Sequence, residues 1–145
     1  MAATTLTILL IEDDDVAAES VLRGLTKMNV SFPVVWAEDG QVALDVLRGQ
    51  DPARRVPRPR VMLLDLNMPR MNGFEFLQQL RADPALADDV VFVLTTSDTD
   101  LDRQRAYHEQ VAGYMVKAAV GPQFAKLAQL LQSYQSAVRL PSPPP

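Results

Sequence analysis

The sequence predicts an α/β fold, in which five parallel strands form one doubly wound sheet with helices on both faces. Short apolar runs alternate along the chain with segments whose apolar residues recur at helical spacing. The apolar runs are continuous, which is typical of strands that are buried on both faces. Strands and helices that alternate in this way are joined by right-handed crossovers into one parallel sheet.

Each predicted strand is a short, β-prone run, and four of the five end at polar residues. The plainest reads Val-Val-Phe-Val-Leu and runs into Thr95. The second is centred on Val34-Val35-Trp36, and the fifth is the short run Gly-Tyr-Met-Val. The predicted strands cover residues 7–11, 32–37, 60–64, 90–94 and 113–116.

The predicted helices differ in the strength of their apolar spacing. The first and the last have clear apolar faces, whereas the fourth has few apolar anchors. The third lies between the Asn72-Gly73 turn and Asp83-Pro84, where proline disfavours further helix. The other four are expected over residues 15–28, 40–48, 100–110 and 124–134.

Length and composition indicate one globular domain. A chain of 145 residues has room for one hydrophobic core and hardly for two. We expect a domain over residues 1–138 and a proline-rich, extended or disordered tail over residues 139–145. No apolar run is long enough to cross a bilayer, and no signal-peptide pattern opens the chain.

Charge and cysteine content narrow the expected location and partners. The chain has no cysteine, which fits a reducing cytoplasm. Its formal net charge of −4 argues against a nucleic-acid partner, which usually requires a basic face. We therefore expect a cytoplasmic protein with neither a membrane nor a nucleic-acid partner.

Polar residues follow four of the predicted strands. In open parallel sheets, ligands bind beyond the carboxyl ends of the strands, at the switch point in strand order. For a flavodoxin-like (βα)5 sheet of order 2-1-3-4-5, this point lies between strands one and three. That order would bring Glu12 and Asp13 next to Asp65, with Thr95 and Lys117 at the ends of strands four and five.

These residue types together suit phosphoryl chemistry. Neighbouring carboxylates raise one another's pKa unless a cation neutralises them. Carboxylate oxygens with water in the open positions suit Mg²⁺, which readily takes phosphate oxygens into its shell. A hydroxyl at Thr95 and an ammonium at Lys117 can meet the remaining phosphoryl oxygens. A carboxylate nucleophile carries no proton, so an acyl phosphate can form without a general base.

Four segments of the chain resemble the signature of response-regulator receiver domains. They occur in the family's order and at its usual spacings, and the resemblance covers about residues 6–136. It implies a single-domain response regulator that catalyses only its own phosphorylation and slow dephosphorylation and is not otherwise an enzyme. The segments are Ile-Leu-Leu-Ile-Glu-Asp-Asp (8–14), Leu-Leu-Asp-Leu-Asn-Met-Pro-Arg-Met-Asn-Gly (63–73), Val-Leu-Thr-Thr (93–96) and Gly-Tyr-Met-Val-Lys (113–117).

The resemblance also implies a nucleophile and a metal site. Asp65 would be the phosphoacceptor, and Glu12 and Asp13 would hold Mg²⁺ together with Asp65. Asn67 would offer its backbone carbonyl to the same metal.

Further residues would bind the phosphoryl group and respond to it. By the same resemblance, Thr95 and Lys117 contact the phosphoryl group, and Thr95 also acts in the switch with Tyr114, whose ring turns inward. Asn67 and Ser97 occupy the positions that tune dephosphorylation in the family.

One position departs from the family pattern. Most receivers have a proline in a cis peptide after the lysine, whereas Ala118 follows Lys117 here. A cis bond costs about 2.5–4 kcal/mol before alanine and about 0.5–1 kcal/mol before proline. The loop therefore either holds that strain or takes a trans path that shifts Lys117.

The candidate residues also have plainer explanations. The acids at residues 12–15 could cap the first helix, and we expect Asp14 or Asp15 to do so. Taken alone, Asp65 could be a solvated loop acid and Lys117 a surface lysine.

Three other features have no strong functional pattern. Tyr114 could be a half-buried strand aromatic, and His108 is assigned no role. The Arg- and Pro-rich loop at residues 51–60 could bind a partner's acids, but we expect it to be simply solvated.

The expected output and partners follow from the resemblance. With no second domain expected after the last helix, the signal would leave through the face formed by the fourth helix, fifth strand and fifth helix. The weakly anchored fourth helix favours this face, which is also a candidate dimer surface. Five features resemble stand-alone receivers of bacterial and cyanobacterial phytochromes: the Arg/Pro loop, Asp-Leu-Asn-Met-Pro, Leu-Thr-Thr-Ser, the small Ala118 and the tail after the last helix. That resemblance implies a phytochrome histidine kinase as donor and a homodimer.

Two alternatives share part of the pattern. A phosphorylation-independent adaptor would keep the fold without needing the site, and only Ala118 favours it. A Mg²⁺-dependent phosphohydrolase would carry a second aspartate two residues after its nucleophile, where Asn67 cannot act as a general acid.

Overall fold

The computed structural model describes residues 6–28, 32–120 and 124–141, and it confirms the predicted α/β architecture. The strands are β1 Thr7–Ile11, β2 Val34–Ala37, β3 Arg60–Leu64, β4 Val90–Thr95 and β5 Gly113–Val116. The helices are α1 Asp15–Lys27, α2 Gly40–Leu47, α3 Gly73–Ala82, α4 Asp100–His108 and α5 Ala125–Ala137, with a 3-10 turn, η1, at Lys117–Ala119.

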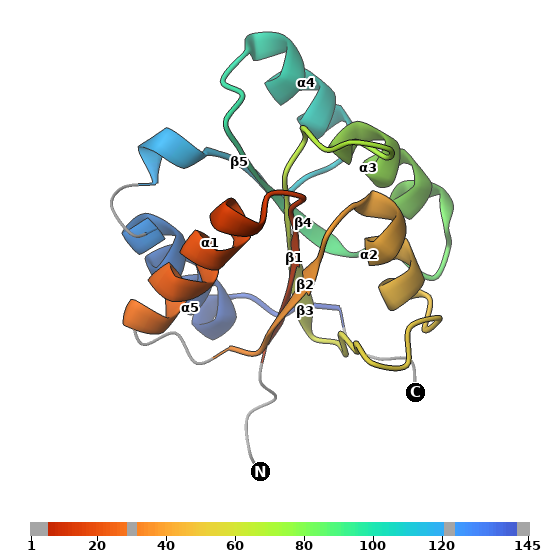
Figure 1. Ribbon diagram of the computed structural model, residues 1–145, viewed down its shortest axis with the longest axis horizontal. Coiled ribbons are helices and arrows are strands. Elements are labelled where there is room, and N and C mark those ends of the chain that lie inside the picture. The colour runs from red at the N-terminus through yellow and green to blue at the C-terminus, as the bar shows by residue number, and fades with distance from the viewer. Residues whose placement is uncertain (1–5, 29–31, 121–123, 142–145) are drawn as a thin grey trace.

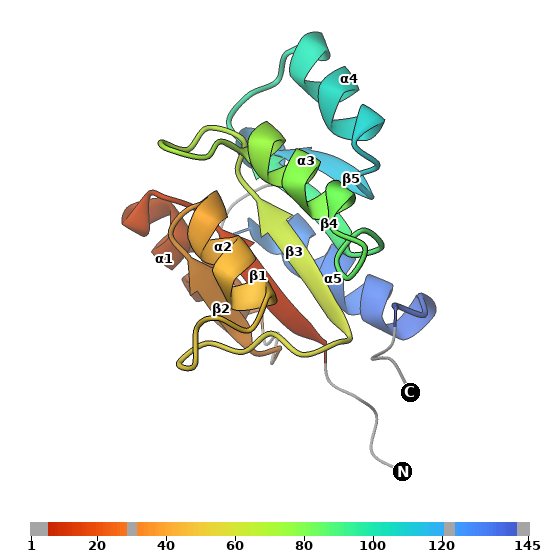
Figure 2. The same ribbon diagram turned by 90° about the vertical axis from the view of Figure 1, so that its right-hand side faces the viewer.

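All five strands are parallel and form one sheet in the order β2-β1-β3-β4-β5, as predicted. Helices α1 and α5 cover one face of the sheet, and α2, α3 and α4 cover the other (Figures 1 and 2). The carboxyl ends of the strands therefore meet at one edge, at the top of Figure 1.

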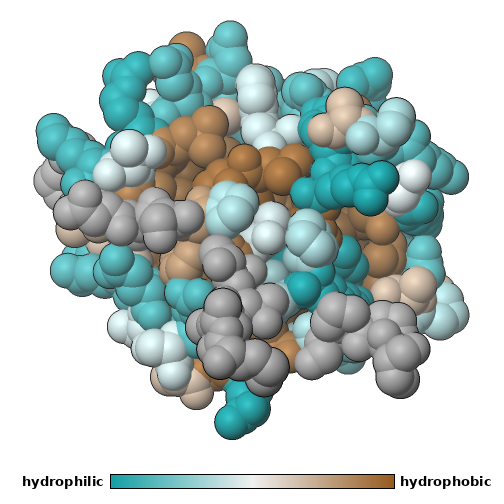
Figure 3. All heavy atoms as spheres, turned by 90° about the horizontal axis from the view of Figure 1, so that it is seen from below, coloured by the Kyte–Doolittle hydropathy of each residue, from teal (hydrophilic) through white to brown (hydrophobic). Residues whose placement is uncertain are grey.

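The core consists of two apolar layers, one on each face of the sheet. In β1, Leu9 and Ile11 pack toward α2 and α3, while Ile8 and Leu10 pack toward α1 and α5. This alternation places both faces of a central strand in the interior, which explains why its sequence is continuously apolar. Seen from the edge where the strands begin, apolar side chains are visible at the centre and hydrophilic ones around them (Figure 3).

Several element boundaries differ from the sequence prediction by one to three residues. Strand β2 begins at Val34 and not at residue 32, after Pro33, which has no backbone N–H to give to a sheet. Helix α5 begins one residue late because Phe124 has a left-handed backbone (φ 56°). The turn η1 was not predicted. Residues 142–145 of the expected tail lie outside the described residues.

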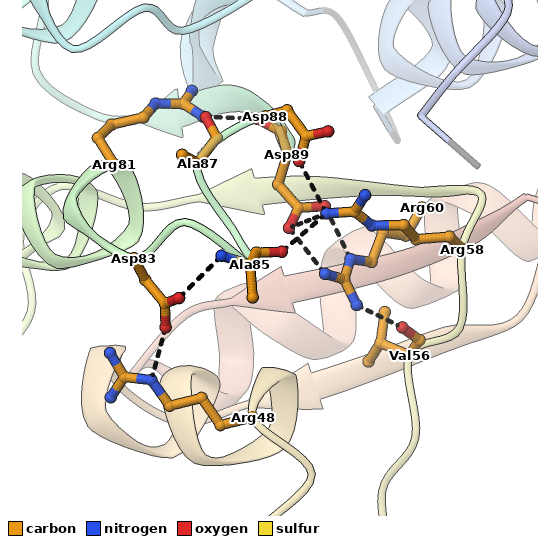
Figure 4. Close-up of polar contacts among 10 residues, drawn as sticks. All are labelled: Arg48, Val56, Arg58, Arg60, Arg81, Asp83, Ala85, Ala87, Asp88 and Asp89. Atoms are coloured by element: carbon orange, nitrogen blue, oxygen red, sulfur yellow. Dashed lines mark hydrogen bonds and ion pairs between the residues drawn. The ribbon is translucent and has the colours of Figure 1, made fainter. Parts of the chain in front are cut away.

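The loop at residues 51–60 is fastened to the rest of the domain. Arg54 pairs with Asp51 and Glu38, whereas Arg58 and Arg60 both pair with Asp89 (Figure 4). The expectation of a simply solvated loop is therefore wrong for these three arginines.

No helix in the described part of the chain has the length and apolar character needed to span a bilayer.

Candidate functional site

The sheet brings the three predicted carboxylates together at the carboxyl ends of β1 and β3. Ile11 pairs with Leu64 in the ladder, and the Asp65 N–H donates to the Ile11 carbonyl at 3.0 Å. One carboxylate oxygen from each of Glu12, Asp13 and Asp65 lies within 4.8 Å of the others. Glu12 and Asp65 are buried and Asp13 is exposed, so the cluster has one open side.

Lys117 reaches this cluster from the end of β5. Its Nζ lies 2.5 Å from Glu12 Oε1 and 3.9 Å from Asp65 Oδ2. Thr95 is fully buried at the end of β4, opposite Val116, the residue directly before Lys117. The structure thus places the predicted hydroxyl and ammonium groups at the same edge of the sheet as the carboxylates.

The peptide bond between Lys117 and Ala118 is trans. Across residues 6–28, 32–120 and 124–141, the single cis peptide joins Arg58 and Pro59. The chain turns into η1 at Lys117, yet its ammonium still contacts Glu12 and faces Asp65. The trans path therefore keeps Lys117 at the cluster.

Glu12 has an unusual electrostatic environment. Burial raises the pKa of its carboxyl from 4.5 to about 7, with the neighbouring Asp65 adding to the rise and the Lys117 ammonium opposing it. Its Oε2 also accepts a hydrogen bond from the Asp14 N–H at 3.4 Å. An acid with a pKa near neutrality takes up or releases its proton easily, and a bound cation would favour the charged form.

The run of acids after β1 divides between the cluster and helix α1. The Asp14 side chain accepts hydrogen bonds from the N–H groups of Val16 and Ala17, so it is the N-cap of α1. The prediction that Asp14 or Asp15 caps this helix is therefore confirmed. Glu12 and Asp13 remain with the carboxylate cluster.

The cluster fits a hard divalent cation such as Mg²⁺. All three side chains offer carboxylate oxygens, the ligand type that Mg²⁺ prefers. Among the described residues, Lys117 is the one basic side chain within ion-pair distance of these carboxylates, so negative charge is in excess. The backbone of Asn67 lies close by, since its N–H donates to Asp65 Oδ1 at 3.3 Å.

A hydrogen-bonded chain connects Thr95 to the loop before α4. The Ser97 N–H donates to Thr95 Oγ1 at 3.4 Å, and the Tyr114 hydroxyl donates to the Ser97 carbonyl at 2.9 Å. Tyr114 is half-buried, and burial raises the pKa of its hydroxyl. Ser97 Oγ donates to Asp102 Oδ2 at 2.6 Å. The structure thus links Thr95, Ser97 and Tyr114 and fastens them to α4.

Sequence reasoning missed two residues that contact this site. Trp36 donates its indole N–H to the Glu12 carbonyl at 2.7 Å, and Asp102 holds Ser97. An aromatic residue in a strand indicates a core position, and an acid in the first turn of a helix indicates a favourable helix-end charge. Neither pattern indicates the tertiary contact.

Comparison with known proteins agrees with this architecture. Residues 8–132 match the response regulator receiver domain family. A probable methanogenesis regulatory protein, FilR2, from Methanothrix harundinacea is 38% identical over 110 residues, or 76% of this chain and 70% of FilR2. The response regulator Rcp1 from Synechocystis is 32% identical over 127 residues, or 88% of this chain and 86% of Rcp1.

Solved structures show the same likeness. A crystal structure of the Mn²⁺-bound form of response regulator Rcp1 has a TM-score of 0.79 at 31% identity and covers 94% of this chain and 99% of its own. That of the phosphorylated cyanobacterial phytochrome response regulator RcpA has a TM-score of 0.82 at 30% identity and covers 96% of this chain and 100% of its own.

Proposed function

The chain belongs to the response regulator receiver family, and from that premise we propose that it accepts a phosphoryl group on Asp65 within a two-component system. One observation carries the proposal. Asp65 is a buried carboxylate with the Lys117 ammonium 3.9 Å away and two further carboxylates within 4.8 Å. This set supplies a nucleophile, a cation for the phosphoryl oxygens and an oxygen-rich metal site.

The proposed reaction needs little covalent chemistry from the protein. An Asp65 oxygen attacks the phosphorus of a phosphohistidine while the P–N bond breaks. The imidazole nitrogen leaves with the bonding electron pair and takes a proton from water. The Lys117 ammonium and the Thr95 hydroxyl then bind phosphoryl oxygens of the acyl phosphate. Asp65 attacks as a carboxylate, so no side chain has to remove a proton.

Mg²⁺ would be held by the side chains of Glu12, Asp13 and Asp65 and by the backbone carbonyl of Asn67. When bound, it neutralises the negative charge of the carboxylates and of the transferring phosphoryl group. The excess of negative charge over Lys117 and the raised pKa of Glu12 support this assignment.

We further propose that the phosphoryl donor is a phytochrome-type histidine kinase in the cytoplasm. The likeness to RcpA, described as a phytochrome response regulator, extends over the whole length of that chain. The Arg/Pro loop before β3, the segments Asp-Leu-Asn-Met-Pro and Leu-Thr-Thr-Ser, the small Ala118 and the tail after the last helix support this assignment, since they also resemble that subgroup.

The face formed by α4, β5 and α5 is the proposed output and homodimer surface. Helix α4 buries only Ala106 and exposes two large apolar side chains, Leu101 and Tyr107. A helix with so small a buried face is weakly held, and Ser97 and Tyr114 connect it to Thr95. Sedimentation with and without acetyl phosphate tests this proposal, since we expect a dimer whose population rises on phosphorylation. A monomer under both conditions would contradict it.

The phosphoryl transfer itself is tested by intact-protein mass after incubation with acetyl phosphate. We expect one added phosphoryl group in the wild type with Mg²⁺ and none without the metal. Asp65→Asn should give no adduct while keeping the fold, because the two side chains are nearly isosteric. An adduct on Asp65→Asn would show that another residue is the acceptor. If the wild type gives no adduct, binding of beryllofluoride distinguishes a short-lived phosphate from a phosphorylation-independent adaptor.

A further inference from the structure

Trp36, the single tryptophan of the chain, connects the edge strand β2 to the carboxylate cluster. Its indole N–H donates to the backbone carbonyl of Glu12 at 2.7 Å, across 24 residues of sequence. The rest of the ring packs with the apolar layer under α1 and α5. That packing explains an aromatic residue at this position, but it does not explain where the N–H points.

The carbonyl that Trp36 binds has a special position. Glu12 follows the last residue of β1, and its N–H makes a ladder bond to the Ala37 carbonyl at 3.1 Å. The Glu12 carbonyl belongs to the planar peptide unit between Glu12 and Asp13. A hydrogen bond that fixes this plane also limits the directions in which the Glu12 and Asp13 side chains leave the backbone.

Trp36 is itself held from the other side. Strand β2 is at the edge of the sheet and pairs with β1 alone. Arg54, from the loop before β3, donates to the Trp36 carbonyl at 3.0 Å. The same guanidinium donates to Asp51 at 2.8 Å and to both Glu38 oxygens at 3.1 Å, so its position is fixed by several bonds.

We propose that Trp36 is a positioning residue for the divalent-metal site and that Arg54 supports it. The indole N–H holds the Glu12–Asp13 peptide in the orientation that presents both carboxylates to the cluster. This assignment rests on the proposed function in that it takes Glu12 and Asp13 as metal ligands. It gives the Arg/Pro loop a function, since Arg54 connects that loop through Trp36 to the site.

The test uses Trp36→Phe, which keeps an aromatic ring in the core and removes the donor. Mn²⁺ binding to the full chain is measured directly, from the electron paramagnetic resonance signal of the free ion. Partners that orient metal ligands typically contribute about 10–100-fold in affinity, so we expect a loss of about tenfold. The maximal rate of phosphorylation at saturating Mg²⁺ should change much less, because the ligands themselves remain. Arg54→Gln should weaken Mn²⁺ binding in the same direction and by a smaller factor.

Val34→Ala is the matched control, because Val34 lies in the same strand and packs in the same apolar layer as Trp36. It should lower stability without changing Mn²⁺ affinity. Wild-type affinity in Trp36→Phe would overturn the inference and leave the proposed function standing. Failure of the wild type to bind Mn²⁺ would overturn both.

A second measurement does not depend on the folding of any Trp36 variant. All tryptophan emission of the wild type comes from Trp36, whose N–H contacts the peptide between two proposed ligands. Titration with Mg²⁺ should therefore change this emission, and Asp13→Asn should abolish the change. Constant emission in a wild type that binds Mn²⁺ would overturn the coupling.

Discussion

Charged side chains gather at both edges of the sheet, and the two clusters differ in charge balance. Where the strands begin, Asp89 accepts hydrogen bonds from Arg60 at 2.7 and 2.8 Å and from Arg58 at 3.3 Å (Figure 4). Where the strands end, the carboxylates of Glu12, Asp13 and Asp65 lie together, and among the described residues only the Lys117 ammonium pairs with this cluster, through Glu12 and Asp65. Both clusters contain buried carboxylate, but only the first has enough cations for it: two guanidinium groups face Asp89, whereas three carboxylates at the other end have one ammonium among the described residues.

The cluster at the beginning of the strands fastens loops together. Asp89 directly precedes β4 and joins it to Arg58 and Arg60 at the end of the Arg/Pro loop. Arg81 of α3 adds hydrogen bonds to the carbonyls of Ala87 at 3.0 Å and Asp89 at 2.7 Å. The buried Asp89 carboxylate is thus balanced by guanidinium groups of the chain itself.

The difference shows that uncompensated charge, rather than buried charge as such, distinguishes a candidate site from a structural network. In a buried ion pair with good geometry, the attraction between the charges offsets the free-energy cost of removing them from water. An excess of negative or positive charge instead shifts the pKa of a group or binds a counter-ion. Glu12 has such a shift, caused first by burial and then by Asp65. The cluster at the carboxyl ends is therefore incomplete in the way that a metal site requires.

The largest expected difference in the free energy of unfolding comes from replacing one buried aspartate with asparagine in each of the two clusters. Asp89→Asn removes the charge that Arg58 and Arg60 share, and breaking a buried pair costs about 3–5 kcal/mol. Asp65→Asn instead relieves repulsion with Glu12, so the metal-free protein should be as stable as the wild type or more so. Urea unfolding without Mg²⁺ measures both free energies.

Asp88→Ala provides the control for the cluster at the beginning of the strands. Asp88 also pairs with Arg58, but its side chain is 62% exposed against 2% for Asp89. Exposed pairs contribute about 0–1 kcal/mol, so this variant should unfold close to the wild type. Equal losses for Asp88→Ala and Asp89→Asn, or a destabilised Asp65→Asn, would break the comparison between the two ends.

Sequence reasoning predicted the fold and the candidate site from features that are local. Continuous apolar runs indicated the parallel strands, and the polar residues after four of these runs indicated what lies at the carboxyl edge. Glu12, Asp65 and Lys117 could be found in this way because a strand end fixes their place once the topology is known. The predicted strand order is that of flavodoxin-like sheets, and these local features do not determine it.

The features that sequence reasoning missed depend on distant contacts. Asp89 stands 29 residues from Arg60, and Trp36 stands 24 residues from Glu12, so no short window contains either pair. The sequence leaves two paths open after Lys117, because alanine at position 118 does not require a cis peptide, and the structure has the trans path. The two hydrogen bonds form because the fold brings these distant residues together.

The smallest expected effect is a pH dependence that arises at the carboxyl-end cluster. Glu12 has a folded-state pKa of about 7 against 4.5 as a free side chain, so the folded protein binds its proton more tightly than the unfolded chain. This contribution to stability is complete below pH 4.5 and is lost as the pH rises through about 7. Without Mg²⁺, the free energy of unfolding should fall by about 1 kcal/mol between about pH 5.5 and about pH 6.5.

Two comparisons assign that slope to Glu12. Glu12→Gln carries no titrating carboxyl, so its unfolding free energy should show a flatter profile over the same pH range. Saturating Mg²⁺ should also flatten the wild-type profile, because a cation favours the ionised carboxylate and lowers its pKa in the folded state. A slope that persists in Glu12→Gln would assign the proton to another group. A slope that Mg²⁺ leaves unchanged would mean that Glu12 is not part of the metal site, and that its excess charge is compensated within the chain as at Asp89.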